Sequence, residues 1–121
     1  MTRRAPDPEP RATLRTTDLL ILVVLSDGPQ HGYAIAQAVR ERSRQHVTVR
    51  PGDLYRVLYR MDRAGLIEPA PDSSRATGAD DRRVQYRITP LGRRVARAQA
   101  AVMTEICAAV LPRQLKPGAG A

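Results

Sequence analysis

Several kinds of residue are scarce in this chain, and each shortage excludes a class of protein. Its 121 residues include no Phe, no Trp and four Tyr, so few side chains are available for an aromatic ligand cage. Cys107 is the one cysteine, which excludes an internal disulfide framework and fits a reducing cytoplasm. The longest apolar run, residues 19–25, is far shorter than the roughly 20 residues that span a bilayer. We therefore expect one small cytoplasmic domain without a membrane segment.

Groups that would support catalysis or bind a metal ion are also scarce. No nucleophile–base pair, pair of carboxylates or phosphate-binding loop is recognisable in the sequence. His31 and His46 lack the spacing of metal ligands, and His31 is expected to be structural, near the start of a helix. Cys107 is expected to be a small core residue, with a redox switch as the less favoured alternative. The sequence thus predicts neither an enzyme nor a cofactor or metal site.

What the chain has in excess is positive charge. The formal net charge is +8, and 19 of the 20 basic residues are arginines. Residues 40–97 hold 14 arginines against seven acidic residues, so this window alone carries a net charge of +7. A basic excess confined to one region suits a polyanion, because each neutralised phosphate releases condensed counterions. The charge distribution therefore favours a nucleic-acid partner.

An apolar segment near the N-terminus predicts the first helix. Residues 19–25 are apolar without interruption, Thr17 or Asp18 can cap the helix, and it is expected to end near Ser26. A helix without a polar side must be covered all round, which a small single chain can hardly provide. We therefore expect a partner to cover part of this helix.

Two further helices follow, and the second of them is basic. Residues 32–42 form the first of the two, with Tyr33, Ile35, Ala36 and Val39 expected on its core-facing side. Residues 51–64 form the other, which Pro51 starts and Gly65 ends. Its core-facing residues recur at three- and four-residue spacing: Leu54, Val57, Leu58 and Met61. Its opposite side carries arginines and tyrosines.

A two-stranded hairpin is predicted after the basic helix. Leu66 and Ile67 begin one strand, residues 69–81 form a polar loop, and residues 83–89 return as the second strand. In that second strand apolar residues alternate with polar or basic ones, so one face packs and the other is basic. The fold class expected is mainly α with a small β-wing, a winged helix-turn-helix followed by a long C-terminal helix.

The last helix is expected to run from Thr89-Pro90 to about Leu111, where Pro112 stops it. Its apolar residues follow the alternating four- and three-residue spacing of a coiled coil. Together with the apolar first helix, this seam predicts a homodimer. The expected interface residues are Leu19, Leu20, Leu22, Val23, Val95, Ala98, Val102, Ile106 and Val110.

Four segments are expected along the chain. Residues 1–16 form a disordered basic, proline-rich arm, and residues 17–90 form the DNA-binding domain. Residues 91–112 form the dimerisation helix, and residues 113–121 form a flexible tail.

The basic helix is expected to enter the major groove of DNA, and the hairpin is expected to lie on the flanking backbone. A solvated helical face is the alternative for these charges. A DNA contact is favoured over that alternative at Arg56, whereas at Arg60 and Arg63 the two are equally supported. Tyr55 is expected to bond a phosphate, and the amide of Gly52 to approach one. The full expected set is Arg50, Gly52, Asp53, Tyr55, Arg56, Tyr59, Arg60, Arg82 and Arg83.

These features resemble the PadR-type winged-helix transcriptional regulators. After the apolar first helix, the resemblance rests on GPQHGY at residues 28–33, PGDLY at 51–55, GLI at 65–67 and RRVQYRITPLG at 82–92. It implies a homodimer joined through the last and first helices, a recognition helix and a wing on DNA. It also implies repression of a nearby gene and release by a small molecule. Arg50 departs from the small hydroxyl residue that often caps the recognition helix in this family.

A small-molecule effector, if one acts, is expected between the first and last helices. The expected lining is mostly aliphatic: Ile21, Leu22, Val95, Gln99, Met103 and Ile106. Because the last helix lacks the aromatic side chains that hold planar drugs in some relatives, a small apolar molecule is favoured over a flat cation. The sequence thus favours a dimeric repressor of a palindrome-like site, relieved by such a molecule. The alternatives are a repressor without an effector and a winged-helix module that binds proteins.

Overall fold

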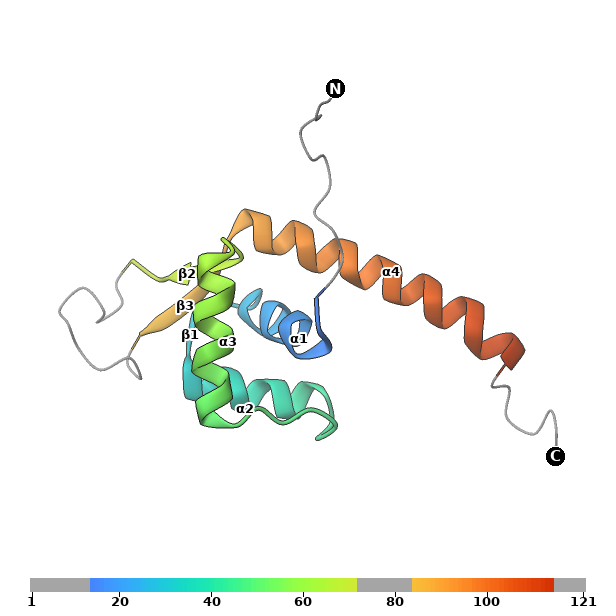
Figure 1. The fold of residues 1–121 in the computed structure, drawn as a ribbon, viewed down its shortest axis with the longest axis horizontal. Helices are drawn as coiled ribbons and strands as arrows, with labels where there is room; N and C mark the ends of the chain where they lie inside the picture. The colour runs from blue at the N-terminus through green and yellow to red at the C-terminus, as the bar shows by residue number, and fades with distance from the viewer. Residues whose placement is uncertain (1–13, 72–83, 115–121) are drawn as a thin grey trace, which may run out of the picture.

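The computed structural model describes residues 14–71 and 84–114. Figure 1 shows the shorter helices packed together, with a small sheet along one side of them and the long C-terminal helix projecting beyond. The elements in order are α1 (Thr16–Leu25), β1 (Gln30–His31), α2 (Gly32–Arg42), α3 (Pro51–Arg63), β2 (Ile67–Pro69), β3 (Gln85–Ile88) and α4 (Pro90–Gln114). The expected class, mainly α with a small β-wing, is confirmed. None of the helices in the described ranges is long and apolar enough to cross a membrane.

The start of α1 differs from its prediction. Arg15 occupies the N-cap position, and no side chain caps the helix. Asp18 lies in the first turn, where a carboxylate complements the helix dipole, but its oxygens accept hydrogen bonds from Arg60 instead of the backbone. The predicted cap at Thr17 or Asp18 is therefore wrong, because the helix begins two to three residues earlier and Asp18 has another partner.

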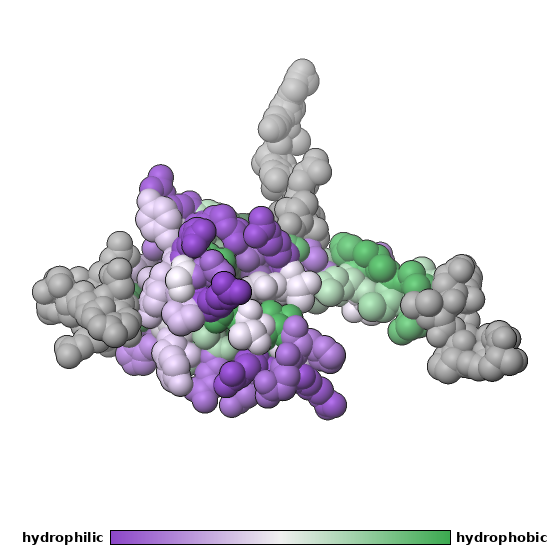
Figure 2. Space-filling view, turned by 60° about the horizontal axis from the view of Figure 1, so that its bottom comes forward, coloured by the Kyte–Doolittle hydropathy of each residue, from purple (hydrophilic) through white to green (hydrophobic). Residues whose placement is uncertain are grey.

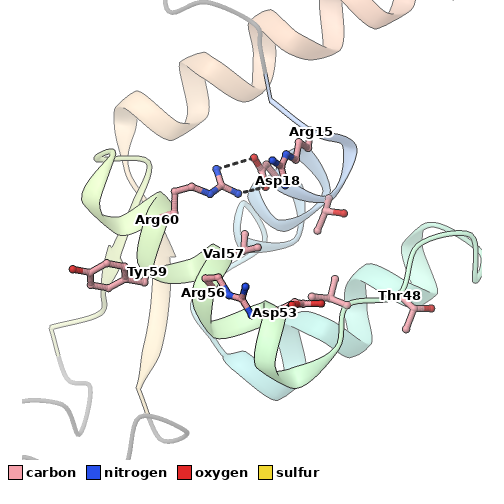
Figure 3. A pocket seen from close by; sticks show the side chains of 10 residues that line it. Arg15, Asp18, Thr48, Asp53, Arg56, Val57, Tyr59 and Arg60 are labelled. Atoms are coloured by element: carbon pink, nitrogen blue, oxygen red, sulfur yellow. Dashed lines mark hydrogen bonds and ion pairs between the residues drawn. The ribbon is translucent and has the colours of Figure 1, made fainter.

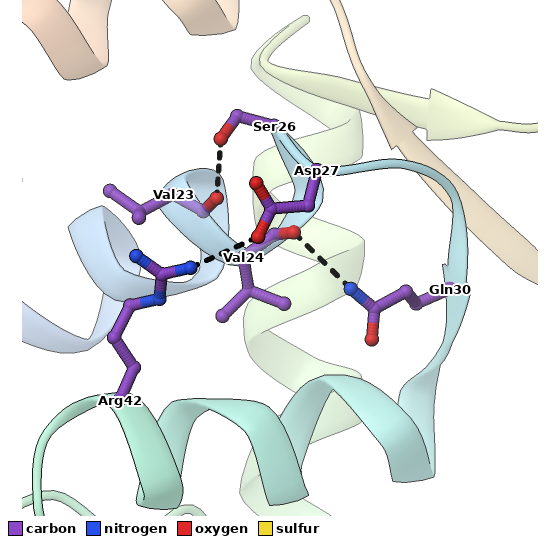
Figure 4. A network of polar contacts seen from close by, with 6 residues as sticks. All are labelled: Val23, Val24, Ser26, Asp27, Gln30 and Arg42. Carbon is purple, nitrogen blue, oxygen red and sulfur yellow. Dashed lines mark hydrogen bonds and ion pairs between the residues drawn. The ribbon is translucent and has the colours of Figure 1, made fainter.

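The bounds of α2 and α3 agree with the sequence pattern. Helix α3 has Pro at its first turn and Arg50 at its N-cap without a side-chain cap bond, as the sequence indicated. It ends where Gly65 adopts a φ of 82°, a left-handed conformation that favours glycine. Three separate polar contacts hold the turn after α1 (Figure 4). Ser26 donates to the carbonyl of Val23, and Gln30 donates to the carbonyl of Val24. Arg42 of α2 forms an ion pair with Asp27 at 3.0 Å.

The three strands form one antiparallel sheet in the order β1-β3-β2. Gln30 lies opposite Tyr86, and Ile67 lies opposite Ile88. The alternation predicted for the second hairpin strand is confirmed at Val84, Arg87 and Ile88, of which the arginine is exposed and the other two are buried, whereas Gln85 and Tyr86 are both half-buried. Strand β1 was not predicted, since two residues carry no period. The predicted loop begins too early, because Pro69 still belongs to β2. The rest of that loop from residue 72, and the wing residues Arg82 and Arg83, lie outside the described residues.

The core is built around α1, which lies between α2 and α4 (Figure 1). Four of its residues are at most 1% exposed, namely Ile21, Leu22, Val24 and Leu25. Leu22 therefore packs within the single chain, as does Val95 of α4 at 5% exposure. Their assignment to a dimer interface is wrong, because this core already covers them. Leu19, Leu20 and Val23 are half-buried and remain open on one side.

Helix α4 is anchored at its start and free at its end. Thr89 caps it by accepting a hydrogen bond from the Gly92 amide at 3.0 Å, and its hydroxyl donates to the carbonyl of Gly65. A side chain at Gly92 would collide with the carbonyl of Leu66, so the start of α4 fits against the end of α3 only with glycine there. Pro112 lies within the last turn and does not end the helix as predicted, because a single missing donor near the terminus leaves the preceding turns intact.

The outer half of α4 exposes apolar side chains. Val102 is 40% exposed, Ile106 56% and Leu111 54%. In Figure 2 hydrophobic residues gather on this projecting helix, whereas hydrophilic residues cover most of the remaining molecule. Cys107 is also exposed, so its assignment to the core is wrong: it lies where α4 has left the other helices.

Candidate nucleic-acid interface

Helix α3 separates buried apolar residues from exposed charged ones. Leu54, Leu58 and Met61 are at most 2% exposed and hold the helix against the core. The exposed side repeats at three- and four-residue spacing and consists of Asp53, Arg56, Arg60 and Arg63, with Tyr59 beside them. We call these five residues the α3 face. The amphipathic pattern read from the sequence is confirmed by this arrangement.

Arg56 is a highly exposed, weakly paired cation of the α3 face. Its side chain is 78% exposed, and it pairs with Asp53 one turn earlier at 3.2 Å. Exposed pairs at this spacing contribute about 0.2–0.5 kcal/mol, so another hydrogen-bond acceptor can replace the carboxylate at little cost. Arg56 is thus free to bind a base edge or a phosphate.

Arg60 is held more firmly. Its two terminal nitrogens donate to the two carboxylate oxygens of Asp18 at 3.0 and 3.2 Å. The Asp18 side chain is 3% exposed, whereas that of Arg60 is 50% exposed. Figure 3 shows Arg60 reaching from α3 across to the start of α1. A DNA contact by Arg60 stays a prediction, and it would have to leave or share this bond.

The tyrosines of α3 differ in their surroundings. Tyr59 is 62% exposed and accepts a hydrogen bond from Arg63 at 2.9 Å, with the Arg63 guanidinium 5.7 Å from the ring centre. Tyr55 is half-buried, and its ring covers Gly32 so closely that a Cβ there would lie 2.9 Å from the Tyr55 hydroxyl. Tyr55 therefore joins α3 to the start of α2. Its predicted phosphate contact stays a prediction.

The start of α3 is open. Arg50 and Gly52 are exposed, and a Cβ built on Gly52 would have no atom within 4 Å. An exposed helical glycine is less favourable than alanine by roughly 0.5–1 kcal/mol, and packing within the chain does not require it here. The absence of a side chain leaves the first amides of α3 accessible to an outside molecule.

A cavity of about 330 Å³ lies between α2 and the start of α3. Its lining surface is mainly apolar, with two arginines among the lining residues: Tyr33, Ala36, Gln37, Arg40, Thr48, Val49, Arg50 and Pro51. Tyr33 is 76% exposed, so its assignment to the core is wrong. It lies four and seven residues before Gln37 and Arg40, and this helical spacing was the signal that placed it on their side.

A second cavity, of about 580 Å³, lies between the start of α1 and α3 (Figure 3). Arg15, Asp18, Asp53, Arg56 and Arg60 line it together with Thr17, Thr48, Val49, Val57 and Tyr59. Thr48 and Val49 belong to both cavities, so the two lie on either side of the segment that leads into α3. Arginine side chains and open cavities therefore flank α3 on both sides.

Residues 21–98 match the sequence model of the family described as the transcriptional regulator PadR-like family. The chain belongs to this family. The matched span runs from the second half of α1 through the described strands to the first part of α4. The resemblance inferred from the sequence motifs is confirmed, and with it the winged helix-turn-helix fold. PadR-like proteins are transcriptional regulators, not enzymes.

Known relatives agree with the PadR-like assignment. The chain is 33% identical over 95 residues to an uncharacterized 37.1 kDa protein in a transposon of Streptomyces fradiae, with 77% of this chain and 25% of the relative aligned. It thus spans about a quarter of that relative's length. A transcriptional regulator from Clostridium thermocellum has a similar structure, with a TM-score of 0.64 and 27% identity over 83% of this chain and 90% of that one. A PadR-like regulator from Bacillus cereus, at 22% identity, has a TM-score of 0.61 over 77% and 85% of the two chains and supports the fold alone.

The described part of the PadR-like wing is less basic than predicted. Arg87 of β3 donates to the Glu68 carboxylate of β2 at 2.7 Å, so an ion pair neutralises the charge of the two strands where these residues lie opposite each other.

His31 is exposed on β1, and its Nε2 lies 3.4 Å from the side-chain nitrogen of Gln85. Among residues 14–71 and 84–114, no three His, Cys, Asp or Glu side chains gather to hold a metal ion.

The cavity between α1 and α4 of this PadR-like chain differs from the one expected. It measures about 230 Å³ and is lined by Leu22, Val23, Ser26, Ile88, Arg93, Ala96, Arg97 and Ala100. Of the predicted lining it shares Leu22, whereas Ile21 and Val95 are buried in the core and do not line it. Gln99 is half-buried and donates to the Leu14 carbonyl at 3.5 Å, Met103 is half-buried, and Ile106 is exposed.

Proposed function

We propose that this PadR-like protein is a dimeric, sequence-specific DNA-binding regulator that represses transcription. One observation carries the proposal above all others: the apolar side of α3 is buried, and its basic side is exposed between two cavities that both have arginines in their lining. This is the arrangement of a recognition helix that enters the major groove while its neighbours bind phosphates.

The proposed contacts divide into base readers and phosphate ligands. Arg56 reads a guanine edge, since its guanidinium is exposed and weakly paired, and Asp53 and Tyr59 flank it. The open amide of Gly52, with Tyr33, Arg40 and Arg50 around the adjacent cavity, binds the backbone. Tyr55 supports this proposed phosphate site by holding the start of α2 against α3. Arg82 and Arg83, which lie outside the described residues, are proposed to contact the flanking backbone.

A homodimer is proposed because α4 exposes apolar surface that water does not solvate well. Burying such surface contributes roughly 25 cal/mol per Å². The proposed interface comprises the open sides of Leu19, Leu20 and Val23 on α1, and Ala98, Val102, Ile106 and Val110 on α4. Two-fold symmetry would then place two recognition helices about one turn of DNA apart, on a palindrome-like site.

A small molecule is proposed to relieve repression by binding between α1 and α4. The 230 Å³ cavity there is mostly aliphatic, and Arg93 and Arg97 are part of its lining, so a short aliphatic carboxylate fits its chemistry. Binding would change how α1 meets α4 and thereby the distance between recognition helices. Ala100→Leu, which reduces the cavity, should abolish release of DNA by short-chain fatty acids while DNA binding persists. Release that is equal in this variant and the wild type would exclude this site.

The proposed function is tested by selecting duplexes from a random pool with the full chain. We expect enrichment of a palindrome-like sequence, bound more weakly as salt rises, by a species that sediments as a dimer. A chain that selects no duplex at low salt would refute DNA binding and favour the alternative of a winged-helix module that binds proteins.

A further inference from the structure

The Asp18–Arg60 pair differs from the other ion pairs in the described ranges. Asp18 is the one buried charged residue there, and its partner lies 42 residues away on α3. The other pairs are exposed on both sides, as in Arg42–Asp27 with side chains 49% and 64% exposed. Arg60 and Asp18 instead form two parallel hydrogen bonds, a geometry that fixes both the distance and the orientation of the partners.

Stability alone does not account for this pair. Removing a carboxylate from water is costly, and apolar residues of similar volume often stabilise a protein as well as a buried ion pair does. Nor does Asp18 serve α1 as a cap, since no side chain caps that helix. What the pair supplies is a defined relation between two helices, because a bidentate bond tolerates little sliding or rotation.

The two helices concerned have different tasks in the proposed regulator. Helix α1 packs against α4, the proposed dimerisation helix. Arg60 lies one turn after Arg56 on the α3 face, so the pair holds α3 next to its proposed base reader (Figure 3). Besides packing, the Asp18–Arg60 bond connects the α3 face to α1, the helix that contacts α4.

We infer that Asp18 and Arg60 are positioning residues that fix the orientation of α3 relative to α1, and thereby where Arg56 meets its base. The inference rests on the proposed function. In the dimer the same bond, present twice, sets the separation of the two Arg56 side chains and hence the preferred spacing of half-sites. Arg60 then contributes to sequence preference through Arg56 and not by reading a base itself.

Asp18→Asn is the decisive variant, because Asp18 is too deeply buried to touch DNA. Charge alone predicts tighter binding, since a negative charge is lost and Arg60 is released toward the polyanion. Positioning predicts the opposite for the selected duplex: about a tenfold loss of affinity, within the range that a misplaced base contact costs. Binding to unrelated duplexes should stay equal or increase, and the preference among half-site spacings should broaden.

Arg60→Gln and the double variant Asp18→Asn/Arg60→Gln complete a cycle. If the pair acts as a unit, each single variant and the double variant lose similar affinity for the selected duplex, so the effects are not additive. Asp27→Asn and Arg42→Gln are matched controls that break an exposed pair, and they should leave sequence and spacing preferences unchanged. Circular dichroism at the assay temperature establishes that each variant is folded.

Three results would overturn the inference while leaving the proposed function intact. Arg60→Gln losing preference at one base pair, with Asp18→Asn unaffected, would make Arg60 a base reader. Equal loss on all duplexes with a smaller salt dependence would make it a phosphate ligand. Failure of Asp18→Asn to fold would make the pair a requirement of the fold. A wild-type chain that selects no duplex would refute the proposed function and this inference with it.

Discussion

At the residue scale, Gly52 is a position where a substitution should affect DNA binding without harming the fold. Nothing within the chain occupies the space where its side chain would be, so Gly52→Ala should fold normally and gain up to about 1 kcal/mol in the free energy of unfolding. The added methyl group would lie at the proposed phosphate site, so affinity for duplex DNA should fall. Chemical denaturation and fluorescence anisotropy measure the two quantities. Gly92→Ala is the contrasting control, because its Cβ would strike the Leu66 carbonyl and destabilise the chain.

Arg56 allows a second prediction at this scale. Arg56→Ala should lose roughly 1–3 kcal/mol of specific binding per half-site and relax the preference at one base pair, as expected for a guanine contact. Arg42→Ala removes the same charge from α2, where Arg42 pairs with Asp27, and should leave the preference intact. Competition with substituted duplexes measures both. Unchanged affinity and preference in Arg56→Ala would show that α3 is not the reader.

Single residues also show what the sequence could and could not predict. Exposure of Arg56 and Gly52 followed from helical spacing, which is local. The partner of Arg60 was not predictable from spacing, because Asp18 lies 42 residues away and folding alone brings the two together. Tyr33 is exposed although the sequence predicts it on the core-facing side, because it shares a helical side with Gln37 and Arg40.

At the scale of elements, length decided which predictions succeeded. Helices α2 and α3, of 11 and 13 residues, contain several turns of an amphipathic pattern, and their bounds agree with the sequence. Strand β1 has two residues and exists because β3 pairs with it. Helix α4 continues past Pro112, where the sequence predicts its end, because a proline so close to the terminus removes a single backbone hydrogen bond. The sequence predicts that the apolar first helix must be buried on every side. Helices α2 and α4 of the same chain bury more of its surface than expected, so less remains for a partner.

Helix α4 carries the prediction at this scale. Val102→Glu places a charge in the proposed seam and should dissociate the dimer, because an unpaired carboxylate cannot be buried between apolar helices at acceptable cost. Thr104→Glu, exposed on another side of α4, is the matched control and should leave the dimer intact. Analytical ultracentrifugation at micromolar concentration distinguishes the two. A dimer that persists in Val102→Glu would remove this seam from the interface.

At the scale of the whole molecule, charge and symmetry together determine how the chain should respond to salt. Affinity for duplex DNA falls with salt in proportion to the number of phosphates contacted, at about 0.9 per phosphate on logarithmic axes. Arg40 lines the cavity beside α3 and is exposed, so it is proposed to neutralise one phosphate in each subunit. Arg40→Ala should therefore lower the slope by about two for a dimer and about one for a monomer, and weaken all duplexes alike. Titrations by anisotropy at several salt concentrations give the slope, with Arg42→Ala as the control.

If Arg40→Ala leaves the slope unchanged, this cavity is not a phosphate site. If the affinity of the wild-type chain for duplex DNA does not change with salt at all, the excess of arginine serves a partner other than nucleic acid.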